Sequence, residues 1–202
     1  MVQHMDAYNM KAKILFSAKK LFSEQGFDGT SVREVCEEAG ANIALVSYYF
    51  GGKENLYYSL MDTFLQFEAV QKETEEYNEP ITYIKQLFHS FITYMMSDKQ
   101  LLNIVIQQSV IQSNRSQYIQ QKMEPIVTKL KSMLYLGKEE GTFHFTSLNE
   151  TLIRVMSVLL SDYNFLLDTQ FAGDENDSHL LKEQIEEKVS FVLGGLGVIL
   201  NS

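Results

Sequence analysis

The sequence predicts an all-α protein of about nine helices, in which a compact group of short N-terminal helices precedes a longer helical part. Apolar residues recur at helical spacing through most of the 202 residues. Only two prolines and eleven glycines interrupt this pattern, and signals for strands are almost absent. The alternation of polar and apolar residues at 142–146 is short enough to be a connector between helices.

The first two helices are delimited by local signals. A first helix is expected over residues 7–25, with Gly26 as its C-terminal cap and Phe27 as an apolar anchor that folds back. A second helix starts at Ser31, because Ser31 and Glu34 have the spacing of a capping box.

The next two helices follow after short breaks. Gly40 ends the second helix, and Asn42 is placed to cap a third helix over residues 43–50. A long fourth helix is expected over 53–75. The polar stretch 73–80 ends in a proline and is predicted to join the two halves of the chain.

The remaining pattern predicts five helices and two domains. We expect a helix-turn-helix domain over residues 1–52 and a second helical domain over 53–202, with helix 53–75 linking them. Pro125 should bend the helix that contains it. The five further helices are expected over residues 81–96, 101–112, 117–139, 148–167 and 179–200.

The charge is unevenly distributed along the chain. The formal net charge is −9, but residues 1–58 carry six Lys/Arg against seven Asp/Glu. The acidic excess therefore lies mainly in the C-terminal part. Any contact with nucleic acid must depend on local placement of cations and backbone amides, because no bulk positive field exists.

Several classes of protein are disfavoured by the sequence. The longest apolar run, 191–200, is too short to span a bilayer, and no signal peptide is evident, so we expect a cytoplasmic protein without a membrane partner. The single cysteine, Cys36, excludes an intrachain disulfide. No metal site or cofactor is expected, because the histidines lie far apart in the sequence. Neither a nucleophile elbow nor a paired carboxylate suggests an enzyme.

One constellation of residues is specific. A first helix ends in Leu-Phe-x-x-x-Gly-Phe at 21–27, Thr-Ser-Val-Arg-Glu-Val follows at 30–35, then Ala-Gly at 39–40, Tyr-Phe at 49–50 and Lys-Glu-x-Leu at 53–56. Over residues 8–58 the chain resembles the DNA-binding domain of the TetR family of bacterial transcription regulators. It departs from the family at Ser47, where a tyrosine is frequent, and at Cys36, where a smaller residue is usual.

The resemblance implies a surface that binds double-stranded DNA, with the third helix in the major groove. Alternatives remain for single residues: Asn42 can act only as a cap, Arg33 can pair with Glu37, and Lys53 can be a solvated lysine beside Glu54. The candidate contacts are Thr30, Ser31, Arg33, Asn42, Ile43, Ala44, Ser47, Tyr48, Tyr49 and Lys53.

The resemblance also implies a C-terminal domain that dimerises and binds a small effector. Aromatic and methionine side chains are the candidates for a mostly apolar effector pocket, although such a stripe is more often plain core. The pocket candidates are Phe64, Phe88, Phe91, Tyr94, Met95, Gln107, Gln108, Tyr118, Met123 and Tyr163. The candidates for a homodimer interface are Leu152, Val155, Met156, Leu159, Ile185, Val189, Val192, Leu196 and Ile199.

The functional hypothesis is a homodimeric repressor that an unknown small molecule releases from a near-palindromic operator. Two alternatives are kept. The first is a DNA-binding regulator that responds to a protein partner. The second is a helical enzyme with an incidental helix-turn-helix.

Overall fold

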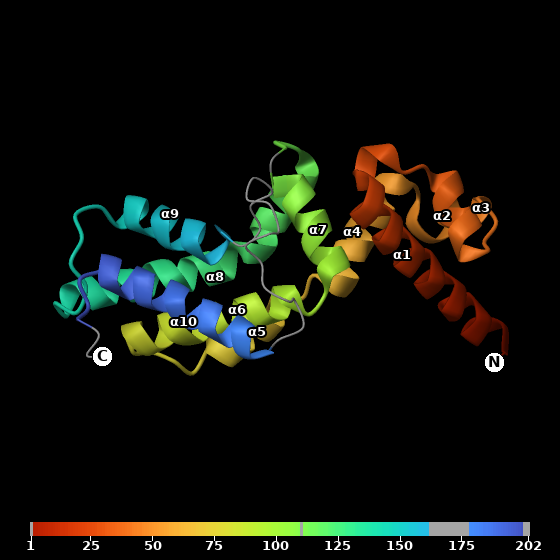
Figure 1. Ribbon diagram of the computed structural model, residues 1–202. Helices are drawn as coiled ribbons and strands as arrows, with labels where there is room; N and C mark the ends of the chain where they lie inside the picture. The colour runs from red at the N-terminus through yellow and green to blue at the C-terminus, as the bar shows by residue number, and fades with distance from the viewer. Residues whose placement is uncertain (1, 110, 162–177, 200–202) are drawn as a thin grey trace. The chain divides into compact units, whose positions relative to one another are not determined.

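The computed structural model describes residues 2–109, 111–161 and 178–199, and side chains of residues 2–9 and 178 are not described. Ten helices and no strand occupy the described residues (Figure 1), which confirms the all-α fold. The chain forms two compact units, one from Met1–Phe67 with Met95–Lys122 and one from Glu68–Tyr94 with Met123–Ser202. None of the described helices is long and apolar enough to cross a membrane.

The first unit is organised around its longest helix. α1 (Val2–Gly29) packs against α2 (Val32–Ala39), α4 (Lys53–Phe64) and α7 (Lys99–Ser109), and α3 (Ala44–Phe50) packs against α4. The start of α8 (Asn114–Glu139) completes this unit. Gly26 interrupts α1 with a left-handed φ of 76°, which an L side chain rarely adopts. The chain turns there and returns Phe27 to the core, where it is 6% exposed.

The expected long helix over 53–75 is two helices. α4 ends at Phe64, and α5 (Glu68–Thr74) follows after a break at Leu65, whose φ and ψ are −89° and 81°. Leu65 and Phe67 are 0% and 1% exposed. In an unbroken helix these two positions would point in nearly opposite directions, because successive residues turn by about 100°. Leaving the helix allows both side chains to be buried.

The second unit contains α5, most of α6 (Pro80–Met96), the rest of α8, α9 (Leu148–Leu159) and α10 (Ser178–Gly195). The polar stretch 73–80, expected to join the two halves, connects α5 to α6 within this unit. Its core includes Ile84, Leu87, Phe88, Leu130, Leu134, Phe143, Leu159 and Leu193. The expected division at residues 52 and 53, which was based on function, stays a prediction.

The connection from α8 to α9 is irregular, as expected for residues 142–146. The buried ring of Phe143 lies against Gly137 of α8, where a Cβ atom would approach the ring to 2.3 Å. The amide of Phe143 donates to the carbonyl of Gly137 at 2.9 Å. Only glycine at position 137 leaves room for this return of the chain.

Most residues expected at a dimer interface are covered by their own chain. Ile199 is 89% exposed, and Leu152 and Met156 are half-buried. The other six are buried within the second unit, in which α9 and α10 pack against each other. These buried residues are Val155, Leu159, Ile185, Val189, Val192 and Leu196. An interface between copies would therefore have to use their outward-facing neighbours.

One buried hydroxyl in the first unit lacks a partner. The Tyr57 side chain is 0% exposed, and its hydroxyl forms no hydrogen bond with any described residue. Burial raises the pKa of Tyr57. Tyr83 in the second unit is buried to a similar degree, and burial raises its pKa while Thr74 opposes that shift. The two tyrosines differ in whether a polar side chain acts on the buried hydroxyl.

We expect Tyr57→Phe to stabilise the protein by about 1 kcal/mol, because it removes an unsatisfied buried polar group. Tyr83→Phe is the matched control and should leave stability unchanged or reduce it, since it removes a hydroxyl on which Thr74 acts. Urea unfolding at one fixed protein concentration measures both. A Tyr57→Phe variant that unfolds at lower urea than the original protein would contradict the assignment.

Candidate nucleic-acid interface

The helix-turn-helix is held by reciprocal backbone caps. The Ser31 hydroxyl accepts from the Glu34 amide at 3.2 Å, and the Ser31 amide donates to the Glu34 carboxylate at 2.7 Å. This confirms the predicted capping box at the start of α2. At the other end Gly40 adopts a left-handed conformation, and its amide donates to the carbonyls of Cys36 and Glu37. The turn to α3 follows directly.

α3 begins with a side-chain bond from Asn42. The Asn42 amide oxygen accepts from the Ala44 amide at 2.9 Å, so Asn42 turns the chain into the helix. The opposite side of α3 is anchored by Val46 and Phe50, which are 0% and 6% exposed. Their burial fixes which face of α3 points to solvent.

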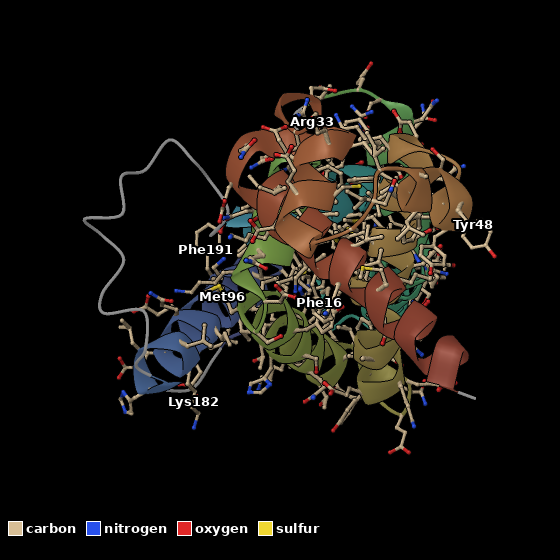
Figure 2. All side chains as sticks on the ribbon, turned by 90° about the vertical axis from the view of Figure 1, so that its right-hand side faces the viewer. Phe16, Arg33, Tyr48, Met96, Lys182 and Phe191 are labelled. Carbon is tan, nitrogen blue, oxygen red and sulfur yellow. The ribbon has the colours of Figure 1, made fainter. Side chains whose placement is uncertain are left out.

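The solvent face of α3 presents a continuous stripe. It is formed by four exposed residues, Ile43, Ala44, Ser47 and Tyr48. Ser47 lies one turn after Ile43, and Tyr48 lies one turn after Ala44. Ile43 is 55% and Tyr48 79% exposed, and Figure 2 shows Tyr48 projecting away from the helices. Tyr49 is half-buried, with its ring 5.2 Å from that of Tyr48.

The chemistry of this stripe suits base edges. The hydroxyls of Ser47 and Tyr48 and the amide of the exposed Asn42 can donate and accept hydrogen bonds. Ile43 and Ala44 offer apolar contact of the kind that thymine methyl groups take. A two-turn helix with one anchored and one exposed face has the size that fits the major groove.

Lys53 begins α4 beside this stripe. No side chain caps α4: its N-cap is Gly52, with φ 140°. The first amides of a helix have no intrahelical acceptor and attract anions. The half-buried Lys53 ammonium lies 4.2 Å from the centre of the Phe27 ring. Burial is the main cause that lowers the pKa of Lys53, and an anion nearby would favour its charged form.

Two α2 candidates are accessible but already engaged. Arg33 is exposed, and its Nε donates to the Glu37 carboxylate at 2.8 Å, so the predicted alternative pairing is present. Ser31 is exposed, and its oxygen accepts from within α2 while its hydroxyl hydrogen can still be donated. Both side chains lie at the start of α2, where a phosphate could still reach them.

Thr30 is not accessible, contrary to the expectation of a phosphate contact. Its side chain is 1% exposed, and its hydroxyl lies 2.8 Å from the Gly26 carbonyl and 3.2 Å from that of Leu21. Its amide donates to the carbonyl of Phe27. Thr30 therefore fixes the turn at the end of α1, and its side chain faces away from any ligand.

Sequence reasoning missed a cation beside α3. Lys11 of α1 is exposed, and its ammonium lies 5.6 Å from the centre of the Phe50 ring. Nothing in the local sequence indicates this proximity, because 39 positions separate the two residues in the printed sequence. The fold thus adds a positive charge near the C-terminal end of α3.

The candidates for an effector pocket divide between the two units. Phe88, Phe91, Tyr94 and Met123 belong to the second unit, and the first three lie on α6. Phe64, Met95, Gln107, Gln108 and Tyr118 belong to the first unit, and Tyr163 lies outside the described residues.

The polar candidates of the first unit serve its packing. Gln107 donates to the Ser23 carbonyl at 3.0 Å, and the buried Gln108 accepts from Arg115 at 3.1 Å. Tyr118 donates to Asp62 at 2.6 Å. Among the described side chains, no group of three or more His, Cys, Asp or Glu is arranged to hold a metal ion.

Comparison with known proteins gives matches over this surface and beyond it. Residues 14–60 match the profile described as bacterial regulatory proteins, tetR family. The chain is 34% identical over 135 residues to the probable regulator YttP of Bacillus subtilis; the match covers 65% of this chain and 64% of YttP, a little under two thirds. It is 25% identical over 179 residues to IcaR of Staphylococcus epidermidis, a negative regulator of the biofilm operon icaADBC, covering 87% of this chain and 95% of IcaR.

The whole fold also has solved counterparts. The crystal structure of HlyIIR, a hemolysin II transcriptional regulator, superposes with a TM-score of 0.68 at 27% identity. That match covers 94% of this chain and 98% of HlyIIR. The similarity therefore extends well past the helix-turn-helix.

We expect Thr30→Val to destabilise the protein by about 1–3 kcal/mol, because it leaves a buried carbonyl without its donor. Thr30→Ser keeps the hydroxyl and is the control. Urea unfolding measures the stability of both variants, and DNA affinity is compared where both are folded. A stable Thr30→Val variant that loses DNA affinity would restore the phosphate contact expected from the sequence.

Proposed function

The chain belongs to the TetR family of bacterial transcriptional regulators, and from this premise we propose that it is a ligand-responsive repressor that binds double-stranded DNA as a homodimer. The observation that carries the DNA-binding part is the exposed stripe of α3, held outward by the buried Val46 and Phe50. Repression is supported by IcaR, which is described as a negative regulator. Such a regulator acts in the cytoplasm, where bacterial DNA lies.

Two copies of α3 would enter successive major grooves, roughly 34–36 Å apart, so the operator would be near-palindromic. Asn42, Ser47 and Tyr48 would contact base edges, while Ile43 and Ala44 would contact apolar groups of the bases. Arg33, Lys53 and the first amides of α4 would bind phosphates and set the register.

The homodimer would form through the outward faces of α9 and α10. Ile153 and Phe191, which are 65% and 71% exposed, would supply large apolar side chains to this contact. Gly194 and Gly195 are also exposed, and a Cβ added to either would meet nothing within 4 Å. Glycine costs a helix about 1 kcal/mol relative to alanine. Within the single chain, no neighbouring atom requires glycine at these two positions. The close approach of a second copy would require it.

The effector would bind in the second unit, where Phe88 and Phe91 are buried and Tyr94 is half-buried on α6. These side chains favour a mostly apolar small molecule. A ligand releases the operator only if it binds the released conformation more tightly than the DNA-bound one.

The test of DNA binding starts with a duplex that the wild-type protein selects from a random pool. We expect Lys53→Ala to weaken binding by about three- to tenfold for all selected sequences alike, and to reduce the slope of log affinity against log salt by about 0.9. Titration of labelled duplex at several salt concentrations measures both quantities.

Lys182→Ala is the matched control, since it removes the same charge from an exposed position on α10 in the other unit. Its affinity and salt slope should equal those of the wild-type protein. If the wild-type protein selects no duplex, the proposed function is wrong. If Lys53→Ala and Lys182→Ala bind alike, Lys53 has no phosphate role.

We expect Phe191→Lys to convert the dimer into a monomer, because it places two like charges at the proposed contact between copies. Light scattering should then report half of the wild-type mass. Phe16→Lys is the control: Phe16 is 56% exposed, lies in the first unit and should leave the mass unchanged. A Phe191→Lys protein that keeps the dimeric mass would exclude this face.

A further inference from the structure

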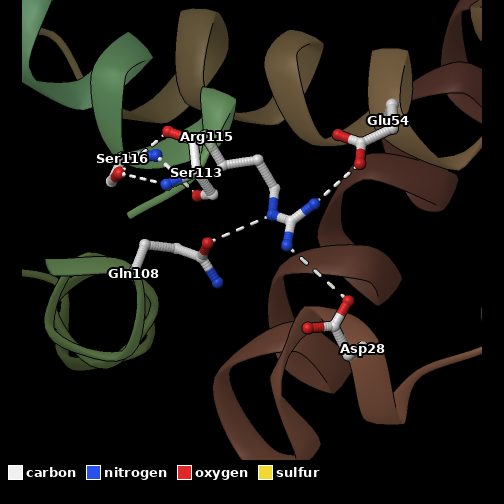
Figure 3. A network of polar contacts seen from close by, with 6 residues as sticks. All are labelled: Asp28, Glu54, Gln108, Ser113, Arg115 and Ser116. Carbon is white, nitrogen blue, oxygen red and sulfur yellow. Dashed lines mark hydrogen bonds and ion pairs between the residues drawn. The ribbon is translucent and has the colours of Figure 1, made fainter. Parts of the chain in front are cut away.

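Arg115, in the first turn of α8, joins three other segments of the first unit (Figure 3). Its Nη1 donates to Glu54 of α4 at 2.6 Å, and its Nε donates to Gln108 of α7 at 3.1 Å. Its Nη2 lies 3.6 Å from the carboxylate of Asp28 at the end of α1. The side chain is only 12% exposed, although both carboxylates are largely exposed. One guanidinium therefore draws two acidic groups to one point.

That point lies beside Lys53. The Cζ atom of Arg115 is 3.9 Å from the centre of the Phe27 ring, and the Lys53 ammonium is 4.2 Å from the same centre. Asp28 follows Phe27 in the chain, and Glu54 follows Lys53. The carboxylate next to Lys53 in sequence and the one that follows Phe27 are thus both paired with Arg115, while a third carboxylate that acts on Lys53, Glu34, caps α2. Among the described residues, Lys53 itself takes part in no ion pair, and its ammonium lies on the ring.

We propose that Arg115 is a positioning residue for DNA binding, which holds Asp28 and Glu54 so that Lys53 stays available to a phosphate. The inference rests on the proposed function, in which Lys53 contacts the DNA backbone. Without the guanidinium, Lys53 would be the nearest cation to both carboxylates and would pair with them. An ammonium paired in this way neutralises no phosphate.

The geometry requires arginine at this position. The planar guanidinium presents donors in fixed directions and reaches three acceptors on three segments at once. A lysine would supply a point charge without this fork, and its ammonium would compete with Lys53 for the same carboxylates. Because Arg115 is nearly buried and its donors are engaged, it is not itself placed to bind a phosphate.

A second pair of contacts keeps α8 in register with α4. Asp62 lies two turns after Glu54 on α4, and Lys122 lies two turns after Arg115 on α8. The Lys122 ammonium is 2.8 Å from the Asp62 carboxylate, and Tyr118 donates to the same oxygen at 2.6 Å. Together these bonds hold the pKa of Asp62 below its usual value against the opposing effect of burial. The pairing at Arg115 is therefore one end of a longer contact between the two helices.

The experiment measures affinity of the full-length protein for the duplex that the wild-type protein selects from a random pool. We expect Arg115→Gln to weaken binding about as much as Lys53→Ala does, three- to tenfold, and to lower the salt slope by about 0.9. Adding Asp28→Asn and Glu54→Gln to Arg115→Gln should restore affinity and slope, because the two carboxylates that Arg115 engages are then absent. The Glu34 carboxylate, which also acts on Lys53, accepts from the Ser31 amide in every variant. In a Lys53→Ala background, Arg115→Gln should cause no further loss.

Lys85→Gln is the control, because Lys85 is an exposed cation on α6, in the other unit and outside the proposed interface between copies, and should not affect binding. Thermal unfolding verifies that each variant is folded at the assay temperature. The inference is overturned if Arg115→Gln binds like the wild-type protein, if the two carboxylate substitutions fail to restore binding, or if the loss persists in the Lys53→Ala background. Failure of the wild-type protein to select any duplex overturns the proposed function, and the inference with it.

Discussion

The Phe27 ring packs against Phe22 and Tyr57, with ring centres 5.3 and 5.6 Å away, and the geometry of the first unit depends on this contact. The contact exists because Gly26 turns the chain at the end of α1 with a left-handed φ. It fixes the end of α1 against α4, and hence the point at which α2 leaves. The cationic groups of Lys53 and Arg115 also pack against the Phe27 ring. One aromatic side chain therefore positions both the helices of the helix-turn-helix and the lysine proposed to bind phosphate.

An acidic protein that binds DNA must keep its few cations near the duplex from being neutralised by its own carboxylates. The net charge is −9, and residues 1–58, with six Lys/Arg against seven Asp/Glu, are close to neutral. In such a setting the pairing pattern matters more than the number of cations. Arg33 is partnered with Glu37, and Lys20 with Glu38, both at the surface, where such pairs are weak and a phosphate can compete. Lys53 is kept free of an ion pair in a different way: the nearly buried Arg115 binds the carboxylates of Asp28 and Glu54.

Features that depend on neighbouring residues could be predicted from the sequence, and those that depend on distant packing could not. The capping box of Ser31 and the end of α2 at Gly40 are local, and the structure has both. Asn42, predicted to cap α3, accepts a bond from the Ala44 amide, but the residue at the N-cap position is Ile43. Thr30 was misjudged because its acceptors lie on the preceding helix, and the sequence does not show that its hydroxyl points inward. The α4 break at Leu65 reflects burial of side chains in two directions. The contact of Arg115 with Glu54 joins residues 61 positions apart, and no local sequence pattern predicts it.

The two faces of α10 show why helical periodicity alone does not locate an interface between copies. Ile185, Val189 and Val192 have the spacing of a contact between copies, yet the chain buries them within one molecule. Lys188 strengthens this internal contact by donating to the Val158 carbonyl and the Ser161 hydroxyl at the end of α9. A regular apolar stripe predicts that one face of a helix is buried, but it does not predict which element or molecule covers that face. The outward face differs in kind, since glycines there weaken the helix and fill no space in the chain. In the proposed homodimer, these glycines would let a second copy approach the outward face of α10 closely.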